Sequence, residues 1–267
     1  MTKSDVRDFW NAESCGERFA VGGTERQRFD EQFRKRYELE PFILPFAEFA
    51  TAEGLDVLEI GVGMGADHLR WARAHPRTLV GIDLTERAVQ YTASRLSAEG
   101  FMPNVRCADG ESLPFPDESF DLVYSWGVLH HSPDTRTAVA EVRRVLRAGG
   151  RARIMIYHRR SIVGMLLWVR YALLTLRPRR SLTEIYAQYL ESPGTKSYSR
   201  TEARDLFREF SAVDLTVELS PGDLLMEEMG QRHAGLLLRL ARAVWPRDLI
   251  RRFGRACGLY LLVSARR

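Results

Sequence analysis

The sequence predicts an α/β fold with a mostly parallel sheet, and two observations carry this prediction. Short apolar, strand-like runs alternate with helix-like stretches through the middle of the chain, which implies crossover connections and a sheet covered on both faces. At 267 residues, with 45% hydrophobic and 28% charged residues, the chain can bury the core of one large domain. We therefore expect a single domain over residues 1–267.

The predicted elements follow from apolar periodicity and turn residues. Seven apolar runs are predicted strands, at residues 55–60, 78–82, 104–108, 120–125, 151–157, 212–219 and 259–265. Helices are predicted between them at residues 66–74, 86–99, 135–146 and 201–210. We expect Gly149 and Gly150 to end the third of these helices. Ser199 and Glu202 have capping-box spacing and introduce the fourth.

Two helical insertions are expected, one after the fifth strand (residues 159–200) and one between the sixth and seventh strands (residues 221–257). Residues 161–176 are apolar, but Arg170 interrupts them, and a bilayer span needs ~20 apolar residues. We interpret this segment as a cap helix over an apolar pocket. The alternative is a helix lying on a membrane surface, with weak peripheral contact through residues 159–180.

Charge and cysteine content narrow the class of function. Residues 1–150 carry 18 basic and 24 acidic side chains, whereas residues 151–267 carry 21 and 11. The basic residues are scattered and form no run with interleaved aromatics, so we expect solvated basic faces and no nucleic-acid partner. The three cysteines lack metal-ligand spacing, and the N-terminus lacks an apolar secretion signal. We therefore expect reduced thiols and a cytoplasmic location.

A glycine-rich turn follows the first predicted strand, in Val57-Leu58-Glu59-Ile60-Gly61-Val62-Gly63-Met64-Gly65-Ala66. Glycines let the chain turn sharply and let a ligand approach the backbone. Taken alone the turn is ambiguous, because Gly61, Gly63 and Ala66 also satisfy the dinucleotide fingerprint, and a tight turn without a ligand is a further alternative.

Later residues reduce that ambiguity. Asp83 ends the second strand 22 residues after Gly61, where a carboxylate can accept both hydroxyl protons of a ribose. Asp109 follows the third strand, and the fourth ends in Ser125-Trp126-Gly127-Val128-Leu129-His130-His131. All of these positions fall at the carboxyl ends of strands, where open α/β sheets bind ligands.

At this point the sequence resembles the class I S-adenosylmethionine-dependent methyltransferases, in the branch of small bacterial single-domain enzymes of the type 11 kind. The resembling stretch runs from about residue 55 to residue 157, and residues 198–200 and the final strand also resemble that family. The matching motifs are Leu58-Glu59-Ile60-Gly61-Val62-Gly63-Met64-Gly65, Gly81-Ile82-Asp83-Leu84-Thr85, Ala108-Asp109-Gly110-Glu111-Ser112-Leu113-Pro114-Phe115, Phe120-Asp121-Leu122-Val123 and Leu129-His130-His131. The resemblance implies a Rossmann-like seven-stranded sheet and S-adenosyl-L-methionine as cofactor, with S-adenosyl-L-homocysteine as product.

The resemblance also implies where that cofactor lies within a binding core at residues 55–158. The residues that would hold its methionine end are Gly61, Gly63 and Gly65, with Glu59 steadying the loop. The backbone around Ser125 and Trp126 would face the methionine ammonium.

The adenosine end is implied to lie against the second and third strands. Asp83 would hold the ribose hydroxyls, and Leu84 would lie against adenine. Asp109 would accept from the adenine amino group, with Gly110 close by.

Three histidines are candidate general bases, because each lies at a strand end that we expect to face the crevice: His130, His131 and His158. His131 precedes Ser132-Pro133-Asp134, so it is also a candidate for simply capping the next helix. His233 lies in the second insertion and is expected at the surface. No cluster has clear metal spacing, so we expect no metal.

The N-terminal stretch of residues 1–50 is expected to form lid helices. Phe9 and Trp10 precede a Cys15-Gly16 turn, and residues 36–41 are expected to open a helix over the cofactor edge. The N-terminal stretch could act as a lid that closes over the cofactor, or it could simply pack on the core. Both interpretations require the same aromatic residues, so both stay open. Cys15 has no activating neighbour in sequence and is not taken as a nucleophile.

The expected reaction is in-line methyl transfer to a small, partly apolar molecule of specialised metabolism, because residues 161–176 and 236–245 are apolar. Other uses of the same cofactor, such as cyclisation or elimination, remain the first alternative, and a non-catalytic binding module is another. A nicotinamide-dependent dehydrogenase is less favoured, since none of Lys3, Lys35 and Lys196 has a tyrosine four residues earlier. The exposed apolar cap would equally suit a homodimer.

Overall fold

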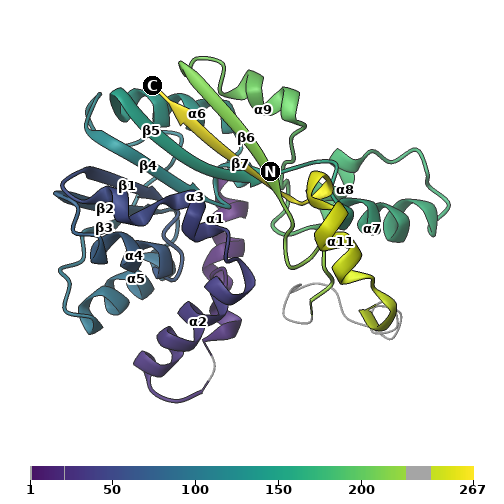
Figure 1. Cartoon of the computed structure of the whole chain (residues 1–267), viewed down its shortest axis with the longest axis horizontal. Helices are drawn as coiled ribbons and strands as arrows, with labels where there is room; N and C mark the ends of the chain where they lie inside the picture. Colours follow the sequence, from purple (N-terminus) through teal and green to yellow (C-terminus); the bar gives the residue numbers. More distant parts are fainter. Residues whose placement is uncertain (1, 21, 227–241) are drawn as a thin grey trace.

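The computed structural model describes residues 2–20, 22–226 and 242–267 of the chain (Figure 1). Its strands are β1 (Asp56–Ile60), β2 (Thr78–Asp83), β3 (Val105–Cys107), β4 (Phe120–Trp126), β5 (Leu146–Tyr157), β6 (Ala212–Glu218) and β7 (Tyr260–Arg266). Its α-helices are α1 (Lys3–Ala12), α2 (Glu25–Leu39), α3 (Ile43–Ala47), α4 (Ala66–Arg73), α5 (Glu86–Ala98), α6 (Thr135–Val145), α7 (Ile162–Trp168), α8 (Leu182–Tyr189), α9 (Arg200–Leu206) and α11 (Arg247–Phe253). Short helical turns are η1 (Glu17–Phe19), η2 (Phe49–Ala52), η3 (Leu129–His131), η4 (Val169–Leu173) and η5 (Arg255–Cys257).

The seven strands form one sheet in the order β3-β2-β1-β4-β5-β7-β6. The pairs from β3 to β5 are parallel, and β7 runs antiparallel between β5 and β6. The strand order reverses between β1 and β4, which are neighbours although two helices and two strands separate them in the chain. This is the position at which an open α/β sheet forms a ligand crevice at its carboxyl edge. The expected seven-stranded, mostly parallel Rossmann-like sheet is confirmed.

Helices cover both faces of the sheet, because its central strands are apolar on both sides. On one face, α6 and α9 bury Val142 and Ala203 against the strands. On the other, α3 and α4 bury Ile43 and Trp71 against Val57 and Tyr124. All five strand residues of β1 are buried, as a central parallel strand requires.

The boundary between α6 and β5 differs from the prediction. The helix ends at Val145, and its carbonyl at Val142 accepts from the backbone N–H of Leu146. Leu146 is extended and fully buried opposite Phe120, so burial in the sheet takes this residue out of the helix. Gly149 and Gly150 therefore lie within β5, beside a register irregularity, and do not end the helix.

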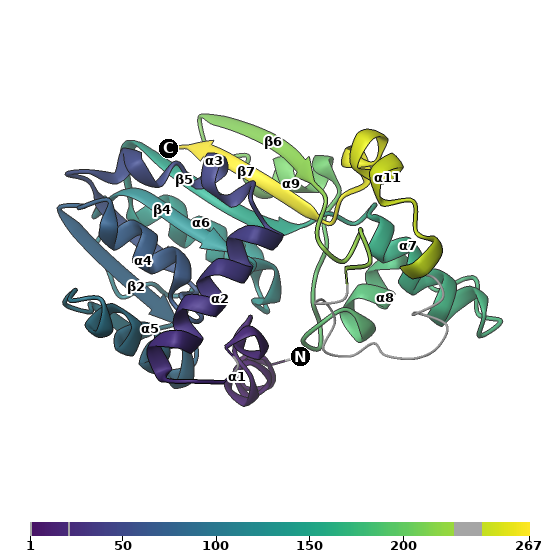
Figure 2. The same ribbon diagram turned by 60° about the horizontal axis from the view of Figure 1, so that its bottom comes forward.

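Residues 36–41 do not open a helix either. Thr24 and Gln27 form the capping box that begins α2, and residues 36–39 are its last turn. The apolar run at 161–176 is divided into α7 and the π-helical turn η4. Together with α8 and α11 these elements lie beyond the end of the sheet (Figure 2). The residues at 227–241, which include His233 and much of the 236–245 segment, lie outside the described part of the chain.

Within the described ranges, no helix is both long and apolar enough to cross a membrane.

Candidate active site

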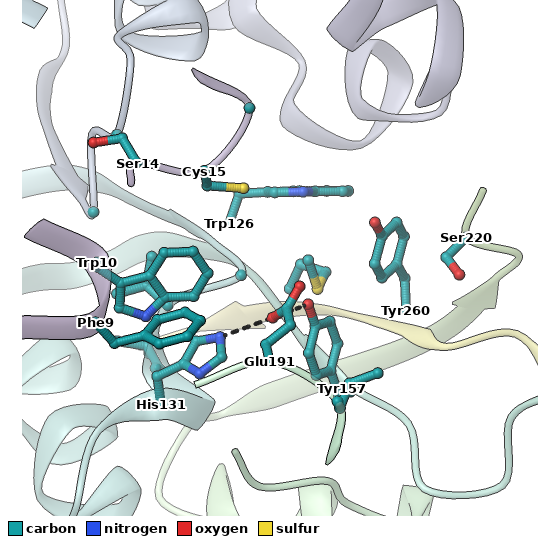
Figure 3. Close-up of a pocket in the computed structure, with 18 of the residues that line it drawn as sticks. Phe9, Trp10, Ser14, Cys15, Trp126, His131, Tyr157, Glu191, Ser220 and Tyr260 are labelled. Atoms are coloured by element: carbon teal, nitrogen blue, oxygen red, sulfur yellow. Dashed lines mark hydrogen bonds and ion pairs between the residues drawn. The ribbon is translucent and has the colours of Figure 1, made fainter. Parts of the chain in front are cut away.

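A pocket with a volume of about 740 Å³ lies at the carboxyl edge of the sheet (Figure 3). Its walls come from the glycine turn after β1, the ends of β2, β4 and β5, the N-terminal helices and the segment after β5. This volume falls within the ~300–1,000 Å³ range of ligand sites.

The glycine turn forms one end of the pocket. Gly61 and Gly63 both line it, and both have positive φ, of 84° and 52°. A Cβ at Gly61 would lie 2.1 Å from Cγ2 of Val128, so a side chain does not fit there. Gly65 begins α4 and packs against Thr92 of α5, and it is not part of the lining.

Asp83 lies beside this turn and its carboxylate organises it. One carboxylate oxygen accepts from the backbone N–H of Gly63 at 3.2 Å. The other accepts from the backbone N–H and the hydroxyl of Thr85, at 3.0 and 2.9 Å. Burial raises the pKa of Asp83 from its ordinary value. Asp83 and Leu84 both line the pocket.

Asp109 and Gly110 line the next part of the pocket, and the N-terminal helix reaches them. The Asp109 carboxylate accepts from the backbone N–H of Glu111 at 2.9 Å and from Lys3 of α1 at 2.5 Å. Lys3 also pairs with Glu111 at 2.7 Å. Asp109, the carboxylate predicted to accept from the adenine amino group, therefore also forms an ion pair with α1.

Glu59 lines the pocket from β1 but is almost entirely buried. Its carboxyl oxygen lies 2.8 Å from Nδ1 of His68 in α4. Burial raises the pKa of Glu59 well above its usual range and lowers the pKa of His68 to about 3, so this contact is a neutral hydrogen bond. Glu59 thus ties the strand before the glycine turn to the helix after it.

Ser125 and Trp126 have different positions at the end of β4. The Ser125 side chain is fully buried, and its hydroxyl donates to the carbonyl of Ile60 at 3.0 Å. It therefore bridges two strands, and Ser125 is not part of the lining. Trp126 does line the pocket.

An aromatic chamber adjoins the end of the pocket formed by the glycine turn. Trp126 meets Tyr260 edge-on at 5.7 Å between ring centroids, and Tyr260 stacks on Tyr157 at 6.2 Å. The Tyr260 hydroxyl donates to the buried carboxyl of Glu40 at 2.5 Å. Apolar side chains after β5 extend this chamber, including Leu167 and others of the pocket lining: Val163, Leu166, Val169, Leu174 and Leu190.

The three candidate histidines are not equivalent. His131 lines the pocket, whereas His130 and His158 do not, so the expectation that all three face the crevice fails for two of them. His130 is fully buried beneath Tyr157, at 3.9 Å between ring centroids, and burial lowers its pKa well below the ordinary value. His158 is buried too, with Nδ1 3.1 Å from the carbonyl of Gly258. Both are enclosed because the segment after β5 folds back over η3 and β5.

Two pocket groups were not found by sequence reasoning. Glu191 follows α8 and lies 3.3 Å from Nε2 of His131, while its carboxylate accepts from the Tyr157 hydroxyl at 2.7 Å (Figure 3). Arg36, at the end of α2, donates to the buried Asp67 of α4, with Nε 2.8 Å from the carboxylate. No local pattern marks Glu191, because a single acid in an insertion is indistinguishable from a surface charge.

One group in the described residues has donor atoms close enough for a metal, namely His130, His131 and Glu191, within 4.8 Å of one another. Glu191 already accepts from Tyr157, and His130 lies outside the pocket. We therefore assign no metal to this group.

The strand order and the reversal between β1 and β4 are those of a Rossmann-like α/β sheet of the methyltransferase type, and a glycine turn and two acids line its crevice. Residues 58–154 match the family model described as "Methyltransferase domain". This match covers 97 of the 267 residues, so the likeness to S-adenosylmethionine-dependent methyltransferases is shown for that core of the chain.

Curated relatives match mainly this core. The chain is 42% identical over 97 residues to an uncharacterized methyltransferase, YcgJ, of Bacillus subtilis, covering 36% of this chain and 38% of the relative. It is 37% identical over 97 residues to the 27-O-demethylrifamycin SV methyltransferase of Amycolatopsis mediterranei, covering 36% of each. Methyltransferase GfsG of Streptomyces halstedii is 29% identical over 163 residues, covering 59% of each. The matched stretch is thus less than two thirds of the length of each of these relatives.

Solved structures share the fold. The crystal structure of the [4+2]-cyclase SpnF superposes with a TM-score of 0.55 at 17% identity, covering 89% of this chain and 81% of that one. An S-adenosylmethionine-dependent methyltransferase of Thermotoga maritima gives a TM-score of 0.50 at 19% identity, covering 91% and 98%.

Proposed function

We propose that the protein transfers the methyl group of S-adenosylmethionine to a small, partly apolar molecule. The observation that carries this proposal is that one continuous pocket joins two chemically different halves. One half has bare backbone at Gly61 and Gly63 and two carboxylates, Asp83 and Asp109. The other has aromatic and aliphatic walls after β4 and β5.

The first half fits the cofactor. A Cβ added at Gly63 would meet no atom within 4 Å, so the backbone there is open to the pocket and the methionine end could lie against the turn. Asp83 faces the pocket and would accept from the ribose hydroxyls, with Leu84 against adenine. Asp109 and Gly110 would lie at the adenine edge. When bound, the cofactor supplies a sulfonium methyl with a leaving group that is already activated.

The protein's task is then mainly alignment of the acceptor with that methyl group. Well-oriented reactants can gain ~7–11 kcal/mol from positioning alone. The apolar wall formed by residues of α7 and η4 would hold the acceptor body, and the aromatic rings of Trp126, Tyr157 and Tyr260 would surround the reacting end. This chemistry suits a partly apolar acceptor, and the names of several relatives specify small-molecule methylation.

The N-terminal residues would serve as the lid. Phe9, Trp10 and Cys15 all line the pocket, with Trp10 and Phe9 next to His131 and Cys15 next to Trp126 (Figure 3). Glu17 of η1 accepts from Arg87 and from Tyr91 of α5, the latter at 2.6 Å. Ion pairs of this kind can open and close without unfolding the core.

Calorimetric titration tests the proposal, using S-adenosylmethionine, S-adenosylhomocysteine and NADH as separate ligands. Saturable binding of the first two alone is expected. Asp83→Ala should weaken that binding about 10- to 100-fold, since a hydrogen bond to a charged group is worth ~1.5–3 kcal/mol. Asp248→Ala, on the exposed side of α11, is the matched control and should leave affinity unchanged.

Binding of NADH alone would overturn the proposal. SpnF, which is a [4+2]-cyclase, shares the fold, so release of methylated product must be shown separately. Radiolabel transfer from methyl-labelled S-adenosylmethionine distinguishes the two: binding without any transfer to a broad acceptor panel would favour a non-methylating reaction.

A further inference from the structure

We propose that the apolar, arginine-rich tip of the cap docks on an anionic lipid bilayer. The cap tip is defined as residues 165–180, which comprise the end of α7, the turn η4 and the residues that lead to α8. Three features carry the inference: an outer side that is apolar and exposed, arginines without acidic neighbours in the chain, and a pocket that reaches the same surface.

The cap tip is apolar on its outer side as well as on its inner side. The inner side is packed, because Leu167 and Ala172 are buried in a cluster with Ile185 of α8. Half of the exposed large hydrophobic side chains in the described residues belong to the outer side: Met165, Val169, Leu173, Leu174 and Leu176. A helical element that is apolar on all sides is normally covered on all sides. We therefore expect a partner for the outer side.

Leu176 is the clearest case. Its side chain is 90% exposed, and its φ of 57° lies in the left-handed region, which bulky residues rarely adopt. Glycine or asparagine would suit this backbone better and would expose less apolar surface. A side chain this exposed gains little from packing on its own chain, so we attribute the leucine to contact with a partner.

The charge of the cap tip indicates the kind of partner. Residues 160–180 contain five arginines and no acidic residue. Arg170, Arg177 and Arg179 are exposed, and none of them forms an ion pair with another residue that the structure describes. The carboxylate of Glu184, the next acid along the chain, already accepts from a backbone N–H at 2.8 Å. Such a face matches a bilayer with anionic headgroups, because leucines can enter the acyl boundary while arginines stay among the phosphates.

Other partners fit this face less well. A second copy of the chain would bring the arginines of two cap tips together, and like charges across an interface oppose association. A nucleic acid offers phosphates to the arginines, but it binds exposed aromatic rings by stacking and has no matching surface for aliphatic side chains. Stable attachment to a membrane needs apolar insertion together with basic charge, and the cap tip supplies both.

The cap tip is also placed to reach a flat surface. In both views the segment after α7 lies at the extremity of the molecule, beyond the end of the sheet (Figures 1 and 2). Val169, Arg170 and Leu174 are exposed on the tip and also line the pocket, so the pocket reaches the same surface. One consequence rests on the proposed function: if methyl transfer takes place in this pocket, the acceptor would enter from the lipid without crossing water, which narrows it to lipid-soluble molecules.

Co-sedimentation with vesicles tests the proposal, using the whole 267-residue chain. Vesicles of phosphatidylcholine alone are compared with vesicles in which a third of the lipid is phosphatidylglycerol. Saturable binding is expected only to the second kind. Leu176→Asn should lower that binding ~10-fold or more, because burial of a leucine side chain is worth ~10- to 100-fold. Met102→Asn, where the side chain is 92% exposed on another part of the surface, is the matched control and should bind like the wild type.

The arginines and the fold of the variants are tested separately. Arg177→Gln combined with Arg179→Gln should weaken binding to anionic vesicles ~25-fold, since one arginine near such a surface contributes ~5-fold. Arg204→Gln combined with Arg208→Gln removes the same net charge from exposed positions in and after α9 and should have no effect. Leu176→Asn should not lower the free energy of unfolding in urea, because asparagine tolerates the left-handed backbone, so its loss of binding would not reflect unfolding.

Equal binding to the two kinds of vesicle, binding to neither, or equal losses for Leu176→Asn and Met102→Asn would overturn the proposal. A wild-type dimer in sedimentation velocity that Leu176→Asn dissociates would assign the outer side to a second copy instead. RNA binding that the paired arginine variant abolishes, without vesicle binding, would assign it to a nucleic acid. Leu176 lies outside the pocket lining, so Leu176→Asn should bind S-adenosylmethionine like the wild type. A wild type that binds anionic vesicles but not S-adenosylmethionine would refute the proposed function and leave the docking surface standing.

Discussion

Replacement of Gly61 by alanine tests whether the turn requires a residue without a Cβ at this position. The added Cβ would lie 2.1 Å from Cγ2 of Val128, and the residue has a φ of 84°. A non-glycine residue in the left-handed region costs ~1–2 kcal/mol. Overpacking of a well-filled site adds ~1–3 kcal/mol. We therefore expect the free energy of unfolding to fall by more than the backbone term alone.

Gly149→Ala separates the two contributions. This glycine has a similar φ, of 76°, but a Cβ added there would meet no atom within 4 Å, so only the backbone cost of ~1–2 kcal/mol applies. Adding Val128→Ala to Gly61→Ala should recover part of the steric loss, although the Cβ of residue 128 remains 3.0 Å away. The recovery appears as a coupling energy in a double-mutant cycle.

Urea unfolding gives these free energies, and calorimetry gives cofactor affinity for each variant that folds. Gly61→Ala should also weaken binding, because the collision moves the turn on which the cofactor would lie. The reasoning is refuted if Gly61→Ala costs no more than Gly149→Ala, or if Val128→Ala and Gly61→Ala act independently.

Two further predictions concern the lid. Partial burial raises the pKa of Glu17, but hydrogen bonds from Arg87, Tyr91 and the Ser14 backbone lower it to about 2, below its ordinary value of 4.5. The contribution of Glu17 to stability should therefore be complete above pH 4.5 and disappear as the pH falls toward 2. The difference in unfolding free energy between the wild type and Glu17→Gln should narrow over that interval. A difference that stays constant with pH would contradict this prediction. Lys3→Ala should change stability by only ~0–1 kcal/mol, because its ion pair is exposed, yet accelerate cofactor release in stopped-flow measurements. Unchanged release would show that this ion pair does not hold the lid.

The half of the pocket lined by the glycine turn and two acids was predictable because its determinants are local. A glycine turn after a buried strand, followed by Asp83 and Asp109 after the next two strands, places these groups at one edge of any parallel sheet. The structure puts Gly61, Gly63, Asp83 and Asp109 around one pocket. The Ser125 side chain does not line the pocket, because it is fully buried and its hydroxyl donates to the carbonyl of Ile60.

The acceptor half was not predictable in the same way. The three histidines have the same residue type and similar positions at strand ends, yet only His131 among them lines the pocket. His130 next to it is fully enclosed beneath Tyr157. Whether a strand-end side chain meets solvent, a ligand or another ring depends on what folds over it, and that cover comes from the segment after β5.

The sequence by itself determined the sheet, its parallel core and the binding edge, because periodicity, glycine turns and strand-end acids act over a few residues. Only the tertiary structure decided three features. These are the boundary between α6 and β5 after Val145, which of the three histidines lines the pocket, and the position of Glu191 next to that histidine. These features depend on burial and on contacts between residues about sixty positions apart, such as His131 and Glu191. Packing of the whole domain brings such distant residues together. A local sequence pattern therefore does not predict these contacts.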